Sequence, residues 1–317
     1  GVSLPSNGVF DAVFSITNNT GDDNSNNDES DLKITAVDEL VPRNDLVEIA
    51  TGRGCGYCPY KDVAKEDISA INPNTIYVEY HNSIFGFDPL ENEGSELYHD
   101  EYNAGSTPSS TLNREEFPDW EINGVRLHPV EIERRYDNGY ANVGAPVSLE
   151  INSTFGESIP KLESEITVEA LSDLEGDIRV VAMLIENGIP ATGNLAQRTY
   201  DTNNPNSPLF GLGDPITNYS HDNTFRFYLT PYHGVPVSAD SSLAKGETFT
   251  LNVDTLVDNI NQNTVNMEIV AFAYRNNIFN VRDRSIMNAL KTELNTETTS
   301  RTEDQSLRLG VYPNPAS

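Results

Sequence analysis

The sequence predicts an α/β domain followed by an antiparallel β-sandwich, within one chain of 317 residues. Between about residues 32 and 141, strand-like and helix-like runs alternate, which favours a sheet with helices on its faces. From about residue 145, apolar and polar residues alternate with period two between turn residues, which is typical of an antiparallel sandwich. A chain of this length is expected to form two or more domains.

The α/β region opens with a predicted strand at residues 46–50, Leu-Val-Glu-Ile-Ala. A helix is expected at 59–71, because Ala64, Ile68 and Ile71 recur at helical spacing and would share one face. The elements expected after it are a strand at 75–80, a helix at 93–103, a strand at 109–113 and a helix at 129–138.

The second region contains short strands in which alternate residues are apolar. A polar segment from Gln197 to Asn223, rich in Asn, Pro and Gly, interrupts them. Long segments without regular structure are either functional or disordered, and both interpretations stay open here. The strands are expected at 147–151, 165–170, 178–184, 225–229, 249–253 and 267–271.

The N-terminal part reads as one strand at 8–17 and then a linker or mobile loop at 18–31, which has no hydrophobic residue. The predicted organisation therefore has four parts. They are an N-terminal strand and acidic linker at 1–31, an α/β domain at 32–143, an Ig-like β-sandwich at 144–294 and a C-terminal linker with the start of a further domain at 295–317.

The composition excludes several classes of partner. The formal net charge of -29 would repel nucleic-acid backbones and anionic membranes, so neither is expected as a main partner. No apolar run approaches the roughly 20 residues that cross a bilayer, and Gly1 reads as the start of a mature or trimmed chain without a signal peptide. Acidic loops are compatible with Ca²⁺, but no complete calcium-loop spacing occurs.

The only two cysteines stand in the motif Cys55-Gly56-Tyr57-Cys58, between a predicted strand and a predicted helix. This spacing and context predict a dithiol/disulfide redox centre. A thiolate at a helix N-terminus is stabilised by unpaired backbone N–H groups and the helix dipole, which makes it nucleophilic. Cys55 is therefore the expected attacking thiol and Cys58 the resolving thiol, with Arg53 adding positive charge.

Two other interpretations of the cysteine pair stay open. The first is a permanently closed, inert disulfide on a scaffold without redox chemistry. The second is a zinc site that combines both cysteines with some of His81, His99 and His128, although no histidine falls in a recognisable ligand spacing. No cofactor is expected beyond the disulfide itself, and the histidines are expected to be ordinary surface or hydrogen-bonded residues.

The CGYC motif after a strand, together with Ser106-Thr107-Pro108-Ser109 opening a later strand, resembles the thioredoxin fold. The combination resembles the periplasmic disulfide isomerases in particular. This resemblance implies a cis Pro108 lying against the dithiol and a Thr107 backbone that receives a substrate strand. It also implies that Tyr57 shapes the dithiol turn.

Two positions depart from the thioredoxin pattern. Gly54 stands where that family usually has an aromatic residue, most often Trp. The buried acid that assists proton transfer in the family would have to be Glu48, and only if one inserted residue is allowed. Both departures concern efficient turnover more than the fold.

Four segments carry a closer resemblance: Val47 to Pro59, Pro108 to Arg114, Tyr219 to Arg226 and Gly234 to Val237. Together they resemble the outer-membrane-protein-28-related family of Bacteroidota. The resemblance covers residues from about 40 to 290 and implies a thioredoxin-like domain followed by a β-rich region.

The C-terminal residues 307–316, which end in Tyr-Pro-Asn-Pro-Ala, resemble the opening of the type IX secretion sorting domain of the same phylum. The resemblance implies recognition by that secretion machinery, export through the outer membrane, and release or attachment at the cell surface. In such an oxidising setting, Cys55 and Cys58 are expected to be disulfide-bonded.

Two functions follow from these features. The first is an exported thiol–disulfide oxidoreductase or isomerase that acts on protein or peptide thiols and disulfides through Cys55 and Cys58. The alternative is a non-enzymatic surface binding or adhesion module with a structural disulfide, in which the 197–223 segment is a candidate contact surface. Because a fold does not imply a function, the site must decide between them.

Overall fold

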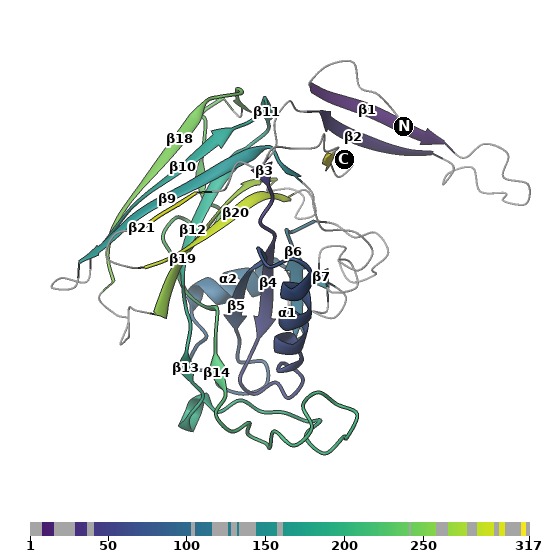
Figure 1. Cartoon of the computed structure of the whole chain (residues 1–317), viewed down its shortest axis with the longest axis vertical. Coiled ribbons are helices and arrows are strands. Elements are labelled where there is room, and N and C mark those ends of the chain that lie inside the picture. Colours follow the sequence, from purple (N-terminus) through teal and green to yellow (C-terminus); the bar gives the residue numbers. More distant parts are fainter. Residues whose placement is uncertain are drawn as a thin grey trace, which may run out of the picture.

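A computed structural model describes most of the chain (Figure 1). In this part of the chain there are two α-helices and one short 3₁₀-helix, and the other regular elements are strands. The described residues are 8–15, 29–36, 41–102, 105–115, 126–127, 132, 144–156, 161–240, 242–257, 266–277, 284–294, 298–301 and 312–314.

The predicted fold class is wrong. The described chain is mostly β-sheet, and a separate thioredoxin-like α/β domain is not evident, because the strands of the two predicted regions hydrogen-bond in one nine-stranded sheet. The join lies between β5 and β15, which pair in parallel with Thr224 opposite Glu79. The only described α-helices are α1 (Tyr60–Ile71) and α2 (Glu93–Glu101).

The nine-stranded sheet has the order β20-β19-β12-β15-β5-β4-β6-β7, with β16 paired to β12. Strand β4 runs parallel to β5 and antiparallel to β6, and β12 runs antiparallel to both β19 and β15. The strands are β4 (Leu46–Thr51), β5 (Ile76–His81), β6 (Ser109–Leu112), β7 (Arg126–Leu127), β12 (Ile178–Glu186), β15 (Thr224–Tyr228), β16 (Val235–Pro236), β19 (Met267–Arg275) and β20 (Ile286–Glu293).

A four-stranded sheet with the order β18-β10-β9-β21 packs against the part of the nine-stranded sheet that contains β12 and β19 (Figure 1). Its inward residues, such as Leu149 and Ile166, belong to the same apolar cluster as Val180 and Ala271 of the larger sheet. Burial alternates along β10, as the period-two pattern predicts. The strands are β9 (Val147–Gly156), β10 (Lys161–Ala170), β18 (Thr248–Leu256) and β21 (Thr298–Arg301).

Short elements complete the description. Residues 29–31 belong to strand β2 and not to the predicted linker, because Glu29 pairs with Ser15 of β1. The predicted helix at 129–138 lies outside the described residues except for Ile132, as does most of 307–316. The elements are β1 (Gly8–Ser15), β2 (Glu29–Ala36), β3 (Val41–Pro42), β8 (Gly144–Ala145), β11 (Leu174–Glu175), β13 (Ile189–Pro190), η2 (Gly193–Leu195), β14 (Ser220–His221), β17 (Ser242–Leu243) and β22 (Tyr312–Asn314).

Helix α1 covers one face of β4 and β5 and buries Ala64 and Ile68 there, whereas the predicted third residue of that face, Ile71, is exposed. Helix α2 contributes Tyr98 to the cluster on the opposite face. It begins where it does because the Asn92 side chain accepts the N–H of Ser95, whose hydroxyl accepts the N–H of Asn92. Strand β4 is therefore buried on both faces, and the CGYC motif follows directly from its end.

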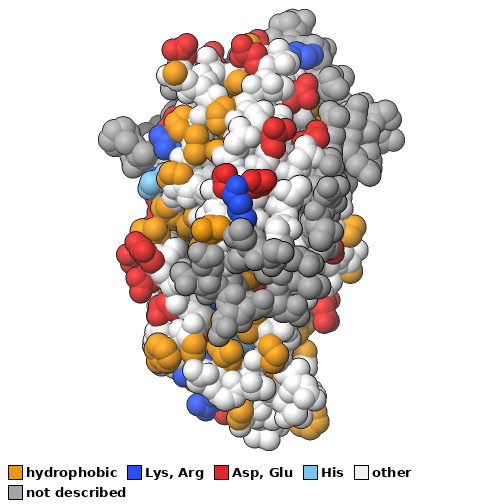
Figure 2. Space-filling view, turned by 90° about the vertical axis from the view of Figure 1, so that its left-hand side faces the viewer, with side chains coloured by type: hydrophobic (Ala, Val, Ile, Leu, Met, Phe, Trp, Pro, Cys, Tyr) orange, Lys and Arg blue, Asp and Glu red, His pale blue; other side chains and the backbone are white. Residues whose placement is uncertain are grey.

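The surface reflects the acidic composition. Figure 2 shows one face of the molecule, on which acidic side chains are spread among hydrophobic and uncharged ones. On the described part of this face, basic side chains are few and scattered.

Candidate functional site

The two cysteines form a disulfide in a tight turn between β4 and α1, with their Cα atoms 5.3 Å apart. The N–H of Cys55 donates to the Gly52 carbonyl at 3.0 Å, and the N–H of Cys58 donates to the Cys55 carbonyl at 3.2 Å. The structure thus forms the disulfide that the motif and its oxidising setting predict. It places the pair at the N-terminal end of α1.

The disulfide is buried and lies against the Thr107–Pro108 peptide bond, which is cis. Cys55 is 2% exposed and Cys58 is 0% exposed, whereas Tyr57 between them is 52% exposed. The Sγ of Cys55 lies 3.4 Å from the carbonyl oxygen of Thr107. A disulfide sulfur carries no hydrogen, so this contact becomes a hydrogen bond only when Cys55 is a thiol. The structure therefore brings together five of the predicted site residues.

The polar segment after β13 lies directly over the CGYC turn. The N–H of Arg198 donates to the Arg53 carbonyl at 2.8 Å, and the N–H of Tyr200 donates to the Gly56 carbonyl at 3.0 Å. The side-chain amide of Gln197 donates to the Cys55 carbonyl at 3.0 Å. We name residues 197–200 the cover. Sequence reasoning identified this segment as a long polar loop and a candidate contact surface, but did not place it at the cysteines.

The polar segment after β13 is also attached to the first turn of helix α1. The hydroxyl of Tyr60 donates to the Asp201 carboxylate at 2.5 Å and lies 2.8 Å from the Ser207 hydroxyl. Further on, the hydroxyl of Tyr219 donates to the Asp62 carboxylate at 2.5 Å. In Figure 1 the segment lies at the foot of the molecule, below β13, β14 and the lower end of α1. The segment is therefore fixed to the first turn of α1 as well as to the CGYC turn.

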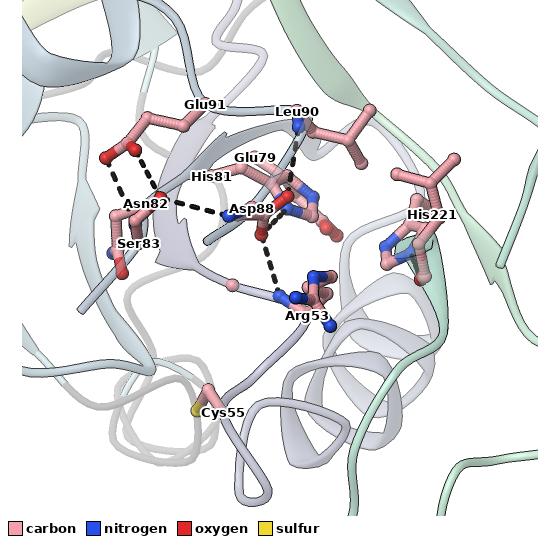
Figure 3. A network of polar contacts seen from close by, with 12 residues as sticks. Arg53, Cys55, Glu79, His81, Asn82, Ser83, Asp88, Leu90, Glu91 and His221 are labelled. Atoms are coloured by element: carbon pink, nitrogen blue, oxygen red, sulfur yellow. Dashed lines mark hydrogen bonds and ion pairs between the residues drawn. The ribbon is translucent and has the colours of Figure 1, made fainter. Parts of the chain in front are cut away.

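A second loop, after β5, lies on the other side of the turn. The Asp88 carboxylate accepts the N–H of Arg53 at 2.8 Å, and the guanidinium of Arg53 donates to the Phe87 carbonyl at 2.7 Å. A Cβ on Gly54 would lie 2.2 Å from the Phe85 carbonyl oxygen. The structure thus directs Arg53 to the backbone of this loop, and in Figure 3 Cys55 lies outside the network of dashed contacts.

Glu48 lies on the face of β4 opposite to α1, together with Leu46 and Ala50. Its carboxylate forms two hydrogen bonds of 2.6 Å with the guanidinium of Arg114 and accepts a third from Tyr80 at 3.1 Å. The carboxylate is therefore engaged with Arg114 on the side of the sheet away from α1. The pKa of the Arg114 guanidinium, which burial would lower, is raised because of this carboxylate.

Glu79 of β5 is the buried carboxylate on the α1 face, and sequence reasoning missed it. Its two oxygens lie 3.1 Å from Lys61 Nζ and 2.6 Å from Lys65 Nζ. Burial alone would raise the pKa of Glu79, but the two ammonium groups lower it. The signal in the sequence is a Glu within an apolar strand, matched by lysines four residues apart on the adjacent helix. This network holds α1 to the sheet.

Two histidines meet between β5 and β14. His81 Nδ1 lies 2.8 Å from the Asp88 carboxylate, and the His81 and His221 rings meet edge to face at 5.0 Å. His221 Nε2 donates to the Leu195 carbonyl at 2.8 Å. The pKa of Asp88, which burial would raise, is lowered by the hydrogen bond from His81. Among the described residues, no group of three or more His, Cys, Asp or Glu could hold a metal ion.

His221 makes stability depend on pH. Burial, and then the neighbouring His81, lower the pKa of His221 from 6.5 to about 4. Between these values the unfolded chain binds a proton that the folded chain does not, so stability falls as pH falls. We expect the free energy of unfolding to decrease by about 1 kcal/mol through this group between about pH 7 and 5.5.

The measurement is urea denaturation of the wild type and of His221→Gln over this pH range. The glutamine amide can still donate to the Leu195 carbonyl, but it does not titrate. The variant should lose less stability on acidification than the wild type. Equal losses in the two proteins would show that His221 does not carry this dependence.

The geometry defines a mostly β protein whose CGYC disulfide is enclosed between two loops and a cis-proline segment. The outer membrane protein Omp28 family matches residues 95–290, more than half of the chain, and the chain belongs to this family. Family membership indicates an outer-membrane or cell-surface location. Neither of the described α-helices has the length and hydrophobicity needed to cross a bilayer.

A solved structure shares the fold. HBP35 of Porphyromonas gingivalis matches with a TM-score of 0.58 and 18% sequence identity, covering 81% of this chain and 76% of that chain. At this identity the similarity concerns the fold alone. No curated protein matches the chain.

Proposed function

We propose that this protein is an exported thiol–disulfide oxidoreductase or isomerase that acts on protein thiols through Cys55 and Cys58. The observation that carries the proposal is the 3.4 Å contact between Cys55 Sγ and the Thr107 carbonyl, which brings a distant segment to the disulfide. In this proposal Thr107 and Pro108 position a peptide, and Tyr57 shapes the turn. The type IX sorting resemblance of residues 307–316 supports export to the cell surface.

The exchange follows ordinary disulfide chemistry. A substrate thiolate attacks Cys55 Sγ, a mixed disulfide forms, and the bond to Cys58 breaks with its electron pair leaving on Cys58, which takes up a proton. A second substrate thiolate attacks the substrate sulfur, and Cys55 leaves and is protonated. Two electrons and two protons have then passed from the substrate dithiol to the cysteine pair. In the reverse direction Cys55 attacks a substrate disulfide and Cys58 resolves the mixed disulfide.

A second function is favoured by a different observation. Both sulfurs are almost completely buried, and the cover occupies the turn around them. A structural disulfide in a non-enzymatic surface binding or adhesion module would have this environment. In that case the 197–223 segment would be part of the contact surface and not a barrier to chemistry.

The test is reactivation of scrambled ribonuclease and reduction of insulin by the wild type, Cys55→Ser and Cys58→Ser. We expect turnover by the wild type and its loss in Cys55→Ser, because no attacking thiol remains. Cys58→Ser should accumulate mixed disulfides through Cys55, because nothing resolves them. A strongly reducing potential of the Cys55–Cys58 couple, with no turnover in the wild type, would contradict the enzyme and favour the structural disulfide.

A further inference from the structure

The cover is bound to the backbone of the residues that flank and include Cys55. Four carbonyls of the turn, those of Gly52, Arg53, Cys55 and Gly56, accept hydrogen bonds from it. The donors are the N–H groups of Arg198 and Tyr200 and the side chain of Gln197, which is 1% exposed. A partner that approached Cys55 along this edge of the turn would have to displace these four bonds.

Tyr200 is the residue of the cover whose side chain packs on the CGYC turn. Its ring lies on Gly56, where a Cβ would approach ring atom Cδ1 to 2.4 Å, and it meets the Tyr57 ring edge to face at 5.2 Å. The side chain is nevertheless 51% exposed, so solvent lies on its outer side. The ring can therefore leave Gly56 without displacing any buried core residue.

The segment that contains the cover has attachments to α1 outside residues 197–200. The bonds of Tyr60 with Asp201 and of Tyr219 with Asp62 hold the segment on α1 outside residues 197–200. Detaching the cover from the turn breaks four hydrogen bonds and one ring contact, and it leaves these attachments intact. The cover is also bonded to Asp214 and Ile216 of its own segment, so these residues move with it or lose their bonds to it. Local openings of this size occur in native proteins without global unfolding.

We propose that residues 197–200 form an autoinhibitory cover, and that the Cys55–Cys58 disulfide reacts only after this cover has left the CGYC turn. The inference rests on the proposed function and deepens it, because it names what controls access to the same disulfide. Tyr200 and Gln197 are the residues that hold the cover in place. The protein is thus closed to thiol partners in the state described here.

The experiment measures the rate at which dithiothreitol reduces the disulfide in the native protein. In this reaction dithiothreitol loses two electrons and two protons and becomes a cyclic disulfide, while Cys55 and Cys58 become thiols. If opening of the cover limits reduction, the wild-type rate should level off as dithiothreitol increases. Tyr200→Ala should raise the rate about tenfold or more, because the open state becomes more populated.

A second variant and a matched control make the test decisive. Gly56→Ala places a Cβ against the Tyr200 ring and should also accelerate reduction, with Tyr200 still present. Tyr60→Phe removes the bonds to Asp201 and Ser207, outside the cover, and should leave the rate within about twofold of the wild type. If circular dichroism shows that Tyr200→Ala is unfolded, Gly56→Ala decides alone.

The proposal would be overturned if the wild-type rate stayed proportional to the dithiothreitol concentration and the variants showed no acceleration. This outcome is distinguishable from failure of the proposed function, because chemical reduction requires no turnover. A protein inactive towards ribonuclease but accelerated by Tyr200→Ala would have a cover without the proposed enzyme activity. An active protein with unchanged reduction rates would be an enzyme without a cover.

Discussion

Replacing Glu48 with alanine is expected to lower the free energy of unfolding by roughly 3–5 kcal/mol. The Glu48 carboxylate is fully buried and forms two bonds of 2.6 Å with Arg114. Without it, the Arg114 guanidinium would remain in the core without its anionic partner. Breaking a buried pair from one side costs far more than the pair itself contributes.

The surroundings of Arg114 leave its unpaired guanidinium few ways to move or to reach water in Glu48→Ala. Its guanidinium lies over the rings of Tyr102, Phe272 and Tyr274, at 5.0, 4.9 and 5.5 Å from their centroids. These rings provide cation–π contacts but no counter-charge. Water that entered to solvate the charge would have to separate this aromatic cluster, so the loss should appear as global destabilisation.

Urea denaturation followed by circular dichroism measures the effect of Glu48→Ala. Glu163→Ala is the matched control, because it removes a carboxylate whose partner Lys161 is exposed, and it should leave the midpoint unchanged. Glu48→Gln keeps the shape and one acceptor and should fall between the wild type and Glu48→Ala. A loss below about 1 kcal/mol for Glu48→Ala would show that the pair is not a main source of stability.

Replacing Gly54 with alanine is expected to cost about 3 kcal/mol, near the upper end for overpacking. A Cβ at this position would lie 2.2 Å from the Phe85 carbonyl oxygen and 2.9 Å from its carbon. Both are backbone atoms, so the loop after β5 must move as a whole. The bond from the Arg53 N–H to Asp88 would lengthen with it.

Two measurements separate this effect from general destabilisation. Denaturation gives the loss of stability, and amide hydrogen exchange at Arg53 reports whether the bond to Asp88 is lost. Gly56→Ala is the matched comparison, since its Cβ meets a movable tyrosine ring and not backbone, and it should cost less. Equal stability of Gly54→Ala and wild type would show that the loop adapts without cost.

Gly54 also explains one departure from the thioredoxin pattern. An aromatic side chain at this position, which is usual in that family, would occupy the space of the Phe85 backbone. The glycine is therefore a consequence of the loop that packs against the turn.

Local elements near the site were predictable because each depends on its own residues. The strands expected at 46–50, 75–80 and 109–113 are observed as β4, β5 and β6, and the helices expected at 59–71 and 93–103 as α1 and α2. The fold class was not predictable in the same way. Periodicity indicates which faces are buried, but it contains no information about which strand lies beside the free edge of β5.

The candidate site, like the fold, was predictable only where it depends on local sequence. The motif and its resemblance predicted the neighbourhood of Cys55 and Thr107, which the structure shows at 3.4 Å. The cover could not be predicted, because it is held by backbone carbonyls and one amide side chain and has no apolar periodicity. The position of Glu48 depended on strand parity, and its shared face with Leu46 and Ala50 settles this.

The join between β5 and β15 rests on Thr224 opposite Glu79 and on the bond from the Glu79 N–H to the Asn223 carbonyl. A fragment that stopped before β15 would leave the backbone edge of β5 open to solvent. An open, apolar parallel strand is a template for association with other chains. Strand β15 thus covers the open edge of the sheet in the part of the chain that contains the cysteines. During folding, the interval before β15 docks is therefore the period of greatest aggregation risk.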